Sequence, residues 1–587
     1  MKYILSAVMM FVMSGIAVAG EAPATPYPLC PAHYDAVKAV LEGKGDAKKS
    51  ITAMDADLAP ALTAANDFSL DRVTQLLTLR GAAERLAIPA ERDMALWLLD
   101  HPKTLARFLH AADDRDNVGK ALGVMKTLRD ADPAKFEKWQ EFCIAYAVVW
   151  DNFGFHHWVK APLDEGALVA SFKFYAANED RLLIKPSALP FELAVYVVGT
   201  RLSKEEREWI LLNYKGGESP GAVYMGIPWT MKLSPAHGQG LNIPYTLANI
   251  KKLGGCCMDQ AYVTENVFRT FGVPAVYDRG AGNRGGHAWA GVLAFKSRVD
   301  WNFSYGRYQD DHYYKGEVND PTDFRQVIPD SVVKMSAAVL RAGSIAKIEE
   351  GYVLGEASRW ADARLPDSPA GGRTRAEVVA DLLEKAIAAC PYHSGNWTFA
   401  AELFTKQRMD RAKGFYWANK FFDLTVKDFP DFTVEFFETF LAAVEDNKQK
   451  AGICAKMFDY LKKNRADLAS DVKIVEGDLW MAEGDVKRAV LAYLYPLVNF
   501  SQDAHVLARA NERFEGLDKK VKEDDLFAAY EDVAKAIATL PKKDKLIKGV
   551  LRTVLERLVP LCEKRDDKKK TAQYRALLDS LGPAPAN

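Results

Sequence analysis

The segment around Cys257 constrains the fold more than any other part of the sequence. Two glycines, Gly254 and Gly255, permit a tight backbone turn, and apolar residues at helical spacing follow them. Gly272 then suits the end of a helix, and Pro274 prevents the helix from continuing. The sequence therefore predicts a helix whose first turn carries Cys257 and whose last residues precede Gly272.

A cysteine in the first turn of a helix has a specific chemical environment. The free backbone N–H groups and the positive end of the helix dipole favour the thiolate form. The same N–H groups can stabilise the oxyanion that forms when sulfur attacks a carbonyl carbon. A glycine-rich loop and a predicted strand beginning at His287 follow, and a histidine base beside a cysteine activates it as a nucleophile. The pattern predicts a Cys–His acyl-transfer site, in which the neighbouring Cys256 is a buried apolar residue.

Three short motifs occur at fixed spacing: Leu253-Gly-Gly-Cys-Cys-Met-Asp-Gln-Ala, Phe271-Gly-Val-Pro-Ala and Gly286-His-Ala-Trp. Together they resemble the transglutaminase-like superfamily, whose members share a cysteine helix, a turn of this type, a His-Ala-Trp strand and an acidic third residue. In that pattern Cys257 matches the nucleophile and His287 the base. The resemblance implies a papain-like α+β core and peptide or protein amides as substrates.

The sequence does not decide which residue orients His287. Asp300 and Asn302 lie on the next predicted strand, and Asp320 precedes a proline as the family's aspartate commonly does. A two-residue turn at 296–297 would pair His287 with Gly306, Gly291 with Asn302, and Leu293 with Asp300. All of these residues would then share one face of the sheet, because side chains alternate with period two. Asp300 and Asn302 are the favoured candidates.

The N-terminus predicts export. Lys2 precedes a short apolar run, and Ala17-Val18-Ala19 presents small residues of the kind that signal peptidase recognises. The apolar run is short for a membrane span of about 20 residues. We expect residues 1–19 to be a signal peptide and the mature protein to be periplasmic or secreted, without a membrane span.

The chain of 587 residues is too long for a single core, so we expect a multi-domain α+β protein. A helical N-terminal region is expected at 20–200, the transglutaminase-like core at 201–330, a connecting segment at 331–375 and a helical array at 376–587. Within the core, residues 216–249 are rich in glycine and proline and predict a long surface loop. The helical array is expected to resemble tetratricopeptide repeats, of about 34 residues each, on the spacing of several small and aromatic residues: Ala386, Pro391, Trp397, Gly477, Trp480, Gly484, Ala489 and Tyr493.

The overall charge and the cysteines narrow the function further. A formal net charge of −1 gives no reason to expect a nucleic-acid partner, and seven scattered cysteines without a CxxC pair predict neither a disulfide scaffold nor a structural zinc site. We expect no cofactor. The sequence thus predicts an exported cysteine peptidase or amide hydrolase that acts through a thioester. The alternative is a non-catalytic protein-binding scaffold, in which the core is a relic and the helical repeats hold a protein partner.

Overall fold

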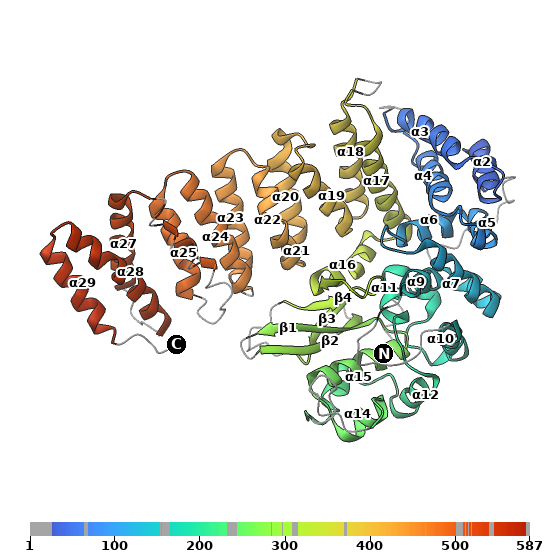
Figure 1. Ribbon diagram of the computed structural model, residues 1–587, viewed down its shortest axis with the longest axis horizontal. Helices are drawn as coiled ribbons and strands as arrows, with labels where there is room; N and C mark the ends of the chain where they lie inside the picture. Colours follow the sequence, from blue (N-terminus) through green and yellow to red (C-terminus); the bar gives the residue numbers. More distant parts are fainter. Residues whose placement is uncertain are drawn as a thin grey trace. The chain divides into compact units, whose positions relative to one another are not determined.

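The computed structural model describes most of the chain from residue 26 to residue 582. The described residues are 26–63, 68–152, 154, 165–231, 243–282, 285–295, 298–307, 315–368, 372–463, 465–499, 509–510, 512–514, 516–517, 519, 521–538 and 545–582. They are mostly helical, with one small antiparallel sheet of five strands (Figure 1). This agrees with the expected combination of helical regions and an α+β part. The predicted signal peptide lies outside the described residues.

The chain divides into two compact units, and the division falls after Ala400, within helix α19. The first unit contains residues 1–281, 285–308 and 315–400. The second contains residues 282–284, 309–314 and 401–587. Each unit is described by itself below.

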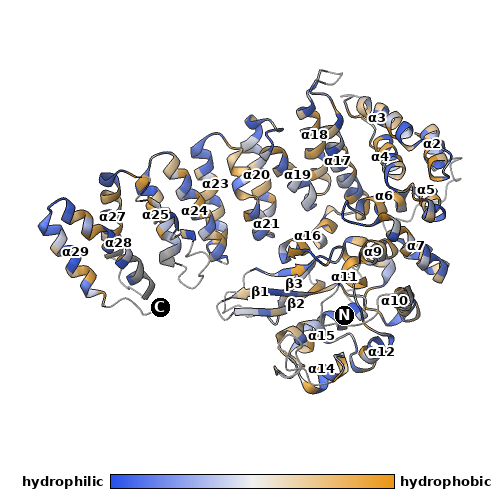
Figure 2. Cartoon of the chain, viewed as in Figure 1, coloured by the Kyte–Doolittle hydropathy of each residue, from blue (hydrophilic) through white to orange (hydrophobic). Residues whose placement is uncertain are grey.

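The first unit begins with helices and short 3₁₀ turns. These are α2 (Pro31–Leu41), α3 (Ala47–Thr63), α4 (Leu70–Arg85), η1 (Pro89–Glu91), α5 (Arg92–Leu99), α6 (Pro102–Ala111), α7 (Val118–Ala131), α8 (Pro133–Lys138), α9 (Gln140–Trp150), α10 (Glu165–Ala177), η2 (Glu179–Arg181), η3 (Pro186–Ala188) and α11 (Phe191–Val198). Helices α9 and α11 pack against each other and are largely hydrophobic (Figure 2), because nearly all of their residues are buried.

The α+β part of the first unit follows α11. It contains α12 (Lys204–Asn213), α13 (Pro220–Met225), α14 (Leu247–Leu253), α15 (Cys257–Thr270), β1 (Ala275–Gly282), β2 (Gly285–Phe295), β3 (Val299–Tyr305), β4 (Glu317–Asn319) and β5 (Val327–Pro329). The strand order is β3-β2-β1-β4-β5. Helix α15 packs against β2, and α16 (Asp330–Ala338) packs against β3, β4 and β5 (Figure 1). The end of the sheet that carries β2 and β3 thus lies next to the N-terminus of α15.

Helix α15 is held by its own charged side chains although it is almost completely buried. Glu265 and Arg269 form an ion pair of 2.7 Å one turn apart, and both side chains are buried. Arg269 also donates to the backbone carbonyl of Ala275, and Glu265 accepts from the backbone N–H of Tyr277. These contacts fix the helix to the start of β1. At the far end, Gly272 adopts a φ of +75°, which suits glycine and stops the helix as the sequence predicts.

The predicted pairing of the β2–β3 hairpin is wrong by one residue. Phe295 pairs with Val299 and Val292 pairs with Asn302, and an irregularity then places Ala290 opposite Tyr305. Three residues rather than two therefore separate the strands, and β3 carries one extra residue beyond Asn302. A slip of one residue moves a side chain to the other face of a sheet.

The expectation of one long loop at 216–249 is also wrong. Helix α13 begins after Ser219, whose hydroxyl accepts from the N–H of Ala222, and α14 begins after Thr246, whose hydroxyl accepts from the N–H of Asn249. Both helices are short but have an ordinary N-cap. The expected loop is therefore partly helical, and residues 232–242 lie outside the described part.

Helices complete the first unit after the sheet. These are α16, η6 (Val339–Ala342), α17 (Ile345–Arg364) and α18 (Arg375–Ala389), followed by the first part of α19 (Ser394–Thr405). The segment 331–375, expected to connect two domains, thus consists largely of helix. Helix α17 packs on α3 and α4, where the Trp360 indole N–H donates to Asp55 at 2.8 Å. This contact ties residues more than 300 positions apart within one unit.

The second unit is helical in its described residues. Its elements are η7 (Arg411–Lys413), α20 (Gly414–Thr425), α21 (Pro430–Glu435), α22 (Phe437–Ala442), α23 (Asn447–Leu461), α24 (Ala466–Ala482), α25 (Val486–Asn499), α27 (Glu523–Ala538), α28 (Lys545–Lys564) and α29 (Lys568–Ser580). Helices α24 and α25 pack together at Gly477, where a Cβ atom would lie 2.4 Å from the ring of Tyr493. Two of the residues in the predicted repeat pattern thus meet at a helix–helix contact.

No helix in the described part of the chain is long and apolar enough to cross a membrane.

Candidate active site

Cys257 is the first residue of α15, as the sequence predicts. Its thiol is half-buried and has a pKa lowered from 9.0 to about 6. The largest cause is a hydrogen bond from the Cys256 thiol, and the backbone N–H groups of Ala288 and Met258 also bond the sulfur, whereas burial and the charge of Asp259 oppose the shift. The lowered pKa favours the thiolate, which is the nucleophilic form of the sulfur.

Cys256 holds the start of the helix in place. It is the N-cap residue of α15 and is buried. Its backbone N–H donates to the carboxylate of Asp259 at 2.7 Å, and the hydroxyl of Tyr245 donates to the other oxygen of that carboxylate, also at 2.7 Å. The burial of Cys256 agrees with the sequence prediction. Its hydrogen bond to Cys257 is an additional role, which the sequence reasoning missed.

His287 lies on β2 next to Ala288, the residue whose N–H bonds the sulfur of Cys257. The structure therefore brings the backbone at His287 to the predicted nucleophile. The imidazole is 8% exposed, and its Nε2 lies 2.6 Å from the backbone carbonyl oxygen of Gly306. A carbonyl can only accept, so Nε2 carries a proton in this arrangement and Nδ1 is the basic nitrogen of the neutral ring.

Asp300 and Asn302 do not lie on the face of the sheet that carries His287. Val292 pairs with Asn302, and residues 287 and 292 of β2 point to opposite faces. Asp300 forms ion pairs with Arg298 at 3.0 Å and Arg341 at 3.2 Å, and Asn302 accepts from the backbone N–H and the hydroxyl of Ser304. The prediction that these residues share a face with His287 is wrong, because the hairpin pairing differs by one residue.

The third candidate, Asp320, follows β4 and is engaged elsewhere. Its carboxylate pairs with Arg115 at 3.0 Å and accepts from the backbone N–H and the hydroxyl of Thr322. Asp320 thus anchors the end of β4 to the helical N-terminal region.

Another buried carboxyl group, which the sequence reasoning missed, lies next to the site. Asp278 on β1 is fully buried, and burial together with the nearby charge of Asp330 raises its pKa well above the ordinary value. Arg307 pairs with Asp330 at 3.0 Å and stacks over the indole of Trp289. An acidic residue within an apolar strand was the only sequence signal for this cluster. The cluster fixes Arg307 directly after Gly306, the residue that contacts His287.

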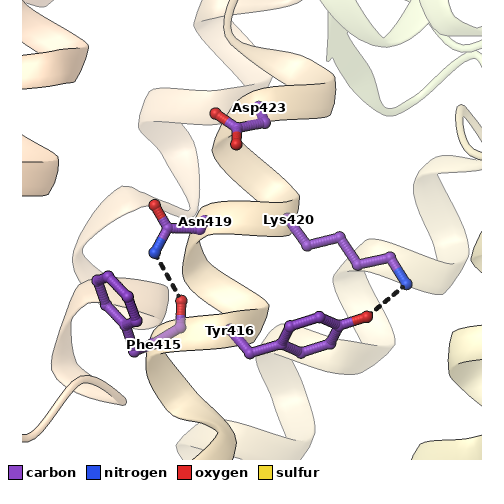
Figure 3. Close-up of a pocket in the computed structure, with 5 residues that line it drawn as sticks. All are labelled: Phe415, Tyr416, Asn419, Lys420 and Asp423. Carbon is purple, nitrogen blue, oxygen red and sulfur yellow. Dashed lines mark hydrogen bonds between the residues drawn. The ribbon is translucent and has the colours of Figure 1, made fainter.

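The second unit carries a separate surface pocket on α20. It is lined by Phe415, Tyr416, Asn419, Lys420 and Asp423 (Figure 3). Both aromatic side chains are 40% exposed or more, and the Lys420 ammonium donates to the Tyr416 hydroxyl at 3.2 Å. Exposed aromatic side chains beside polar groups of both charges are typical of a surface that contacts another molecule.

The described residues contain no group of three or more histidine, cysteine or acidic side chains placed to hold a metal ion. All seven cysteines are free thiols, including the adjacent Cys256 and Cys257.

No model of a known protein family matches the chain, and the chain matches no curated protein and no solved structure.

Proposed function

We propose that the protein is a cysteine-dependent acyl-transfer enzyme of the transglutaminase-like kind, which cleaves peptide or protein amide bonds through a thioester. The observation that carries the proposal is the environment of Cys257: a thiol at a helix N-terminus, with a pKa lowered to about 6, bonded to the N–H of the residue that follows His287. Structural cysteines in protein interiors ordinarily have a raised pKa, as burial causes at Cys143.

The proposed reaction moves one proton between Cys257 and His287 and forms one covalent bond between the sulfur and the substrate. The Cys257 thiol gives its proton to Nδ1 of His287, and the thiolate attacks the amide carbonyl carbon to form a tetrahedral oxyanion. First-turn N–H groups of α15 stabilise that oxyanion. The C–N bond breaks as the imidazolium returns the proton to the leaving amine, and a thioester remains. Water then attacks the thioester with His287 as base, which releases the carboxylic acid and restores the thiol.

The same proposal includes the acyl acceptor and the cellular compartment in which the enzyme acts. Water is the proposed acyl acceptor, because it is the default acceptor of a thioester at a cysteine nucleophile. The substrate is a peptide or protein, and the enzyme acts in the periplasm or outside the cell after removal of residues 1–19. No cofactor takes part.

The test is transfer of an acetyl group from p-nitrophenyl acetate to the purified mature protein. We expect a burst of p-nitrophenol equal to the amount of enzyme and one acetyl group on Cys257, located by peptide mass spectrometry. Cys257→Ala should abolish the burst. His287→Ala should slow it by on the order of 100-fold, the usual contribution of a general base.

Cys454→Ala is the matched control, because Cys454 is buried in α23 of the second unit and should leave the burst unchanged. An unmodified Cys257 in the wild type, or an unchanged burst in Cys257→Ala, refutes the proposal. Casein incubated with and without a fluorescent primary amine then separates the two reactions: new amino termini indicate hydrolysis, and fluorescent casein indicates transfer.

A second candidate function is protein binding without catalysis. The pocket on α20 favours it, because Phe415 and Tyr416 expose aromatic surface that the second unit does not cover (Figure 3). In that case the helical array holds a protein partner, and the core is a relic. Phe415→Ala together with Tyr416→Ala should then abolish function in the producing cell, while Cys257→Ala leaves it intact. The reverse result supports the enzyme.

A further inference from the structure

Tyr224 contacts two residues that bond the proposed catalytic pair, Ala288 and Gly306. It is the fifth residue of the short helix α13 and is 1% exposed. Its hydroxyl donates to the backbone carbonyl of Ala288 at 2.8 Å, and the N–H of the same Ala288 bonds the sulfur of Cys257. One side chain therefore holds the residue from which the nucleophile takes a hydrogen bond.

The ring of Tyr224 also lies against Gly306. A Cβ atom at residue 306 would stand 2.3 to 2.6 Å from three atoms of that ring, and Gly306 adopts a φ of +88°, where a side chain is strained. Only glycine fits this position. The carbonyl of Gly306 contacts Nε2 of His287 at 2.6 Å, so the ring is packed on the residue that contacts the base.

The residue that follows Gly306 is fixed as well. Arg307 pairs with the buried Asp330 and stacks over Trp289. Gly306 thus lies between the ring of Tyr224 and the anchored Arg307, and these two contacts limit the movement of its carbonyl. By contrast, the side chains expected for this task, Asp300 and Asn302, lie on the opposite face of the sheet.

We propose that the backbone carbonyl of Gly306 orients His287 in place of an acidic side chain, and that Tyr224 is the positioning residue that holds both this carbonyl and the N–H of Ala288. The inference rests on the proposed acyl-transfer function. A neutral carbonyl fixes the tautomer that leaves Nδ1 as base, but it stabilises the imidazolium less than a carboxylate does. The geometry of the pair therefore depends on Tyr224 and on a glycine at position 306.

The first experiment measures the rate of carboxamidomethylation of Cys257 by iodoacetamide from pH 5 to pH 9. Tyr224→Phe keeps the ring and removes the hydroxyl, so Ala288 is held less firmly. We expect labelling to slow about fivefold at pH 6 and to remain unchanged at pH 9, because one weakened hydrogen bond to a charged sulfur lowers the thiolate fraction only at low pH.

Tyr175→Phe is the matched control. Tyr175 is equally buried, and its hydroxyl also donates to a backbone carbonyl, that of Arg269 at the other end of α15. Both variants lose one hydroxyl and one buried bond, but only Tyr224 touches the residues of the site. If the pH profiles of the two variants coincide, the role of Tyr224 is refuted.

The second experiment tests whether the carbonyl of Gly306 orients His287. Gly306→Ala and Gly343→Ala place alanine at similar φ angles, +88° and +94°, but nothing lies within 4 Å of the added atom at Gly343. We expect acetylation of Cys257 to fall more than tenfold in Gly306→Ala and less than twofold in Gly343→Ala, because a misplaced base loses most of its contribution. Equal rates overturn the inference. If Cys257 of the wild type is labelled at pH 6 no faster than a free thiol, the proposed function itself is refuted. This measurement needs no variant, so the two failures can be told apart.

Discussion

Two histidines buried in the first unit make its stability depend on pH. His110 on α6 and His393 before α19 flank the ring of Tyr352, with ring centroids 5.2 and 4.4 Å away. Burial, together with the nearby guanidinium groups of Arg107 at His110 and Arg359 at His393, lowers the pKa of each imidazole from 6.5 to about 3. Both histidines are therefore neutral in the folded protein between pH 7 and pH 5.

The size of the effect on stability follows from the difference in proton binding between the folded and the unfolded chain. Below pH 6.5 the unfolded chain protonates these histidines and the folded chain does not, so the free energy of unfolding falls as the pH falls. Between pH 6.5 and pH 3 each histidine costs about 1.4 kcal/mol per pH unit. At pH 5 the loss is about 2 kcal/mol for each histidine and about 4 kcal/mol for the pair.

The assay is urea unfolding at pH 7 and pH 5, followed by hydrogen exchange of the α6 and α17 backbone amides, which report on the first unit. The wild type is compared with a variant that carries His110→Gln and His393→Gln. Glutamine is neutral at both pH values, so the variant should lose about 4 kcal/mol less than the wild type between pH 7 and pH 5. Using each protein as its own reference at pH 7 removes the cost of the substitutions themselves. An equal loss of stability in both proteins would refute the reasoning.

Three further predictions concern the site and the helical array. Cys256→Ala should raise the pH at which Cys257 is half-labelled by iodoacetamide, because the largest cause of its lowered pKa is removed, whereas Cys256→Ser keeps a donor and should shift the midpoint less. Asp300→Asn should leave the rate of Cys257 acetylation within twofold of the wild type, and a drop of tenfold or more would restore Asp300 as a catalytic candidate. Gly477→Ala should destabilise the second unit by about 1 to 3 kcal/mol in thermal unfolding, because its Cβ would strike a tyrosine ring, while Gly452→Ala, with nothing within 4 Å, should not.

The parts of the site that depend on local sequence could be predicted. Gly254 and Gly255 before the helix and Gly272 after it define α15 without help from the rest of the chain, and Cys257 follows as its first residue. The helical array was predictable in the same way, since Gly477 allows close approach at a helix–helix contact. In both cases the signal is a small residue at a position where a side chain would not fit.

The short helices α13 and α14 were also encoded locally, but by a weaker signal. Ser219 followed by Pro220 is a good N-cap and first residue, and Thr246 is another ordinary N-cap. Glycine-rich and proline-rich surroundings outweighed these caps in the sequence interpretation. A helix of six or seven residues contributes too few apolar positions for periodicity to reveal it.

The hairpin pairing could not be predicted, because it is set by contacts distant in sequence. Trp301 packs at right angles on Tyr196 of α11, and its indole N–H donates to Ser336 of α16. Asp300 pairs with Arg341, which lies 41 residues further along the chain. These contacts fix which residues of β3 point inward, and the pairing with β2 then follows. A turn of three residues satisfies them, whereas the two-residue turn assumed from sequence would turn Trp301 outward.

There is a physical reason why the sequence does not show which residue orients His287. If the groups that hold Cys257 and His287 are the N–H of Ala288 and the carbonyl of Gly306, they belong to the backbone, which every residue has. The sequence is then constrained only through the residues that position the backbone. These are a glycine where φ is +88°, and a tyrosine whose hydroxyl bonds Ala288 while its ring packs against Gly306. A search for an acidic side chain cannot find such a site. An arrangement held by the backbone also predicts which substitutions should matter most. Tyr224 and Gly306 should tolerate change less than Asp300 and Asn302, although only the latter pair resembles catalytic residues.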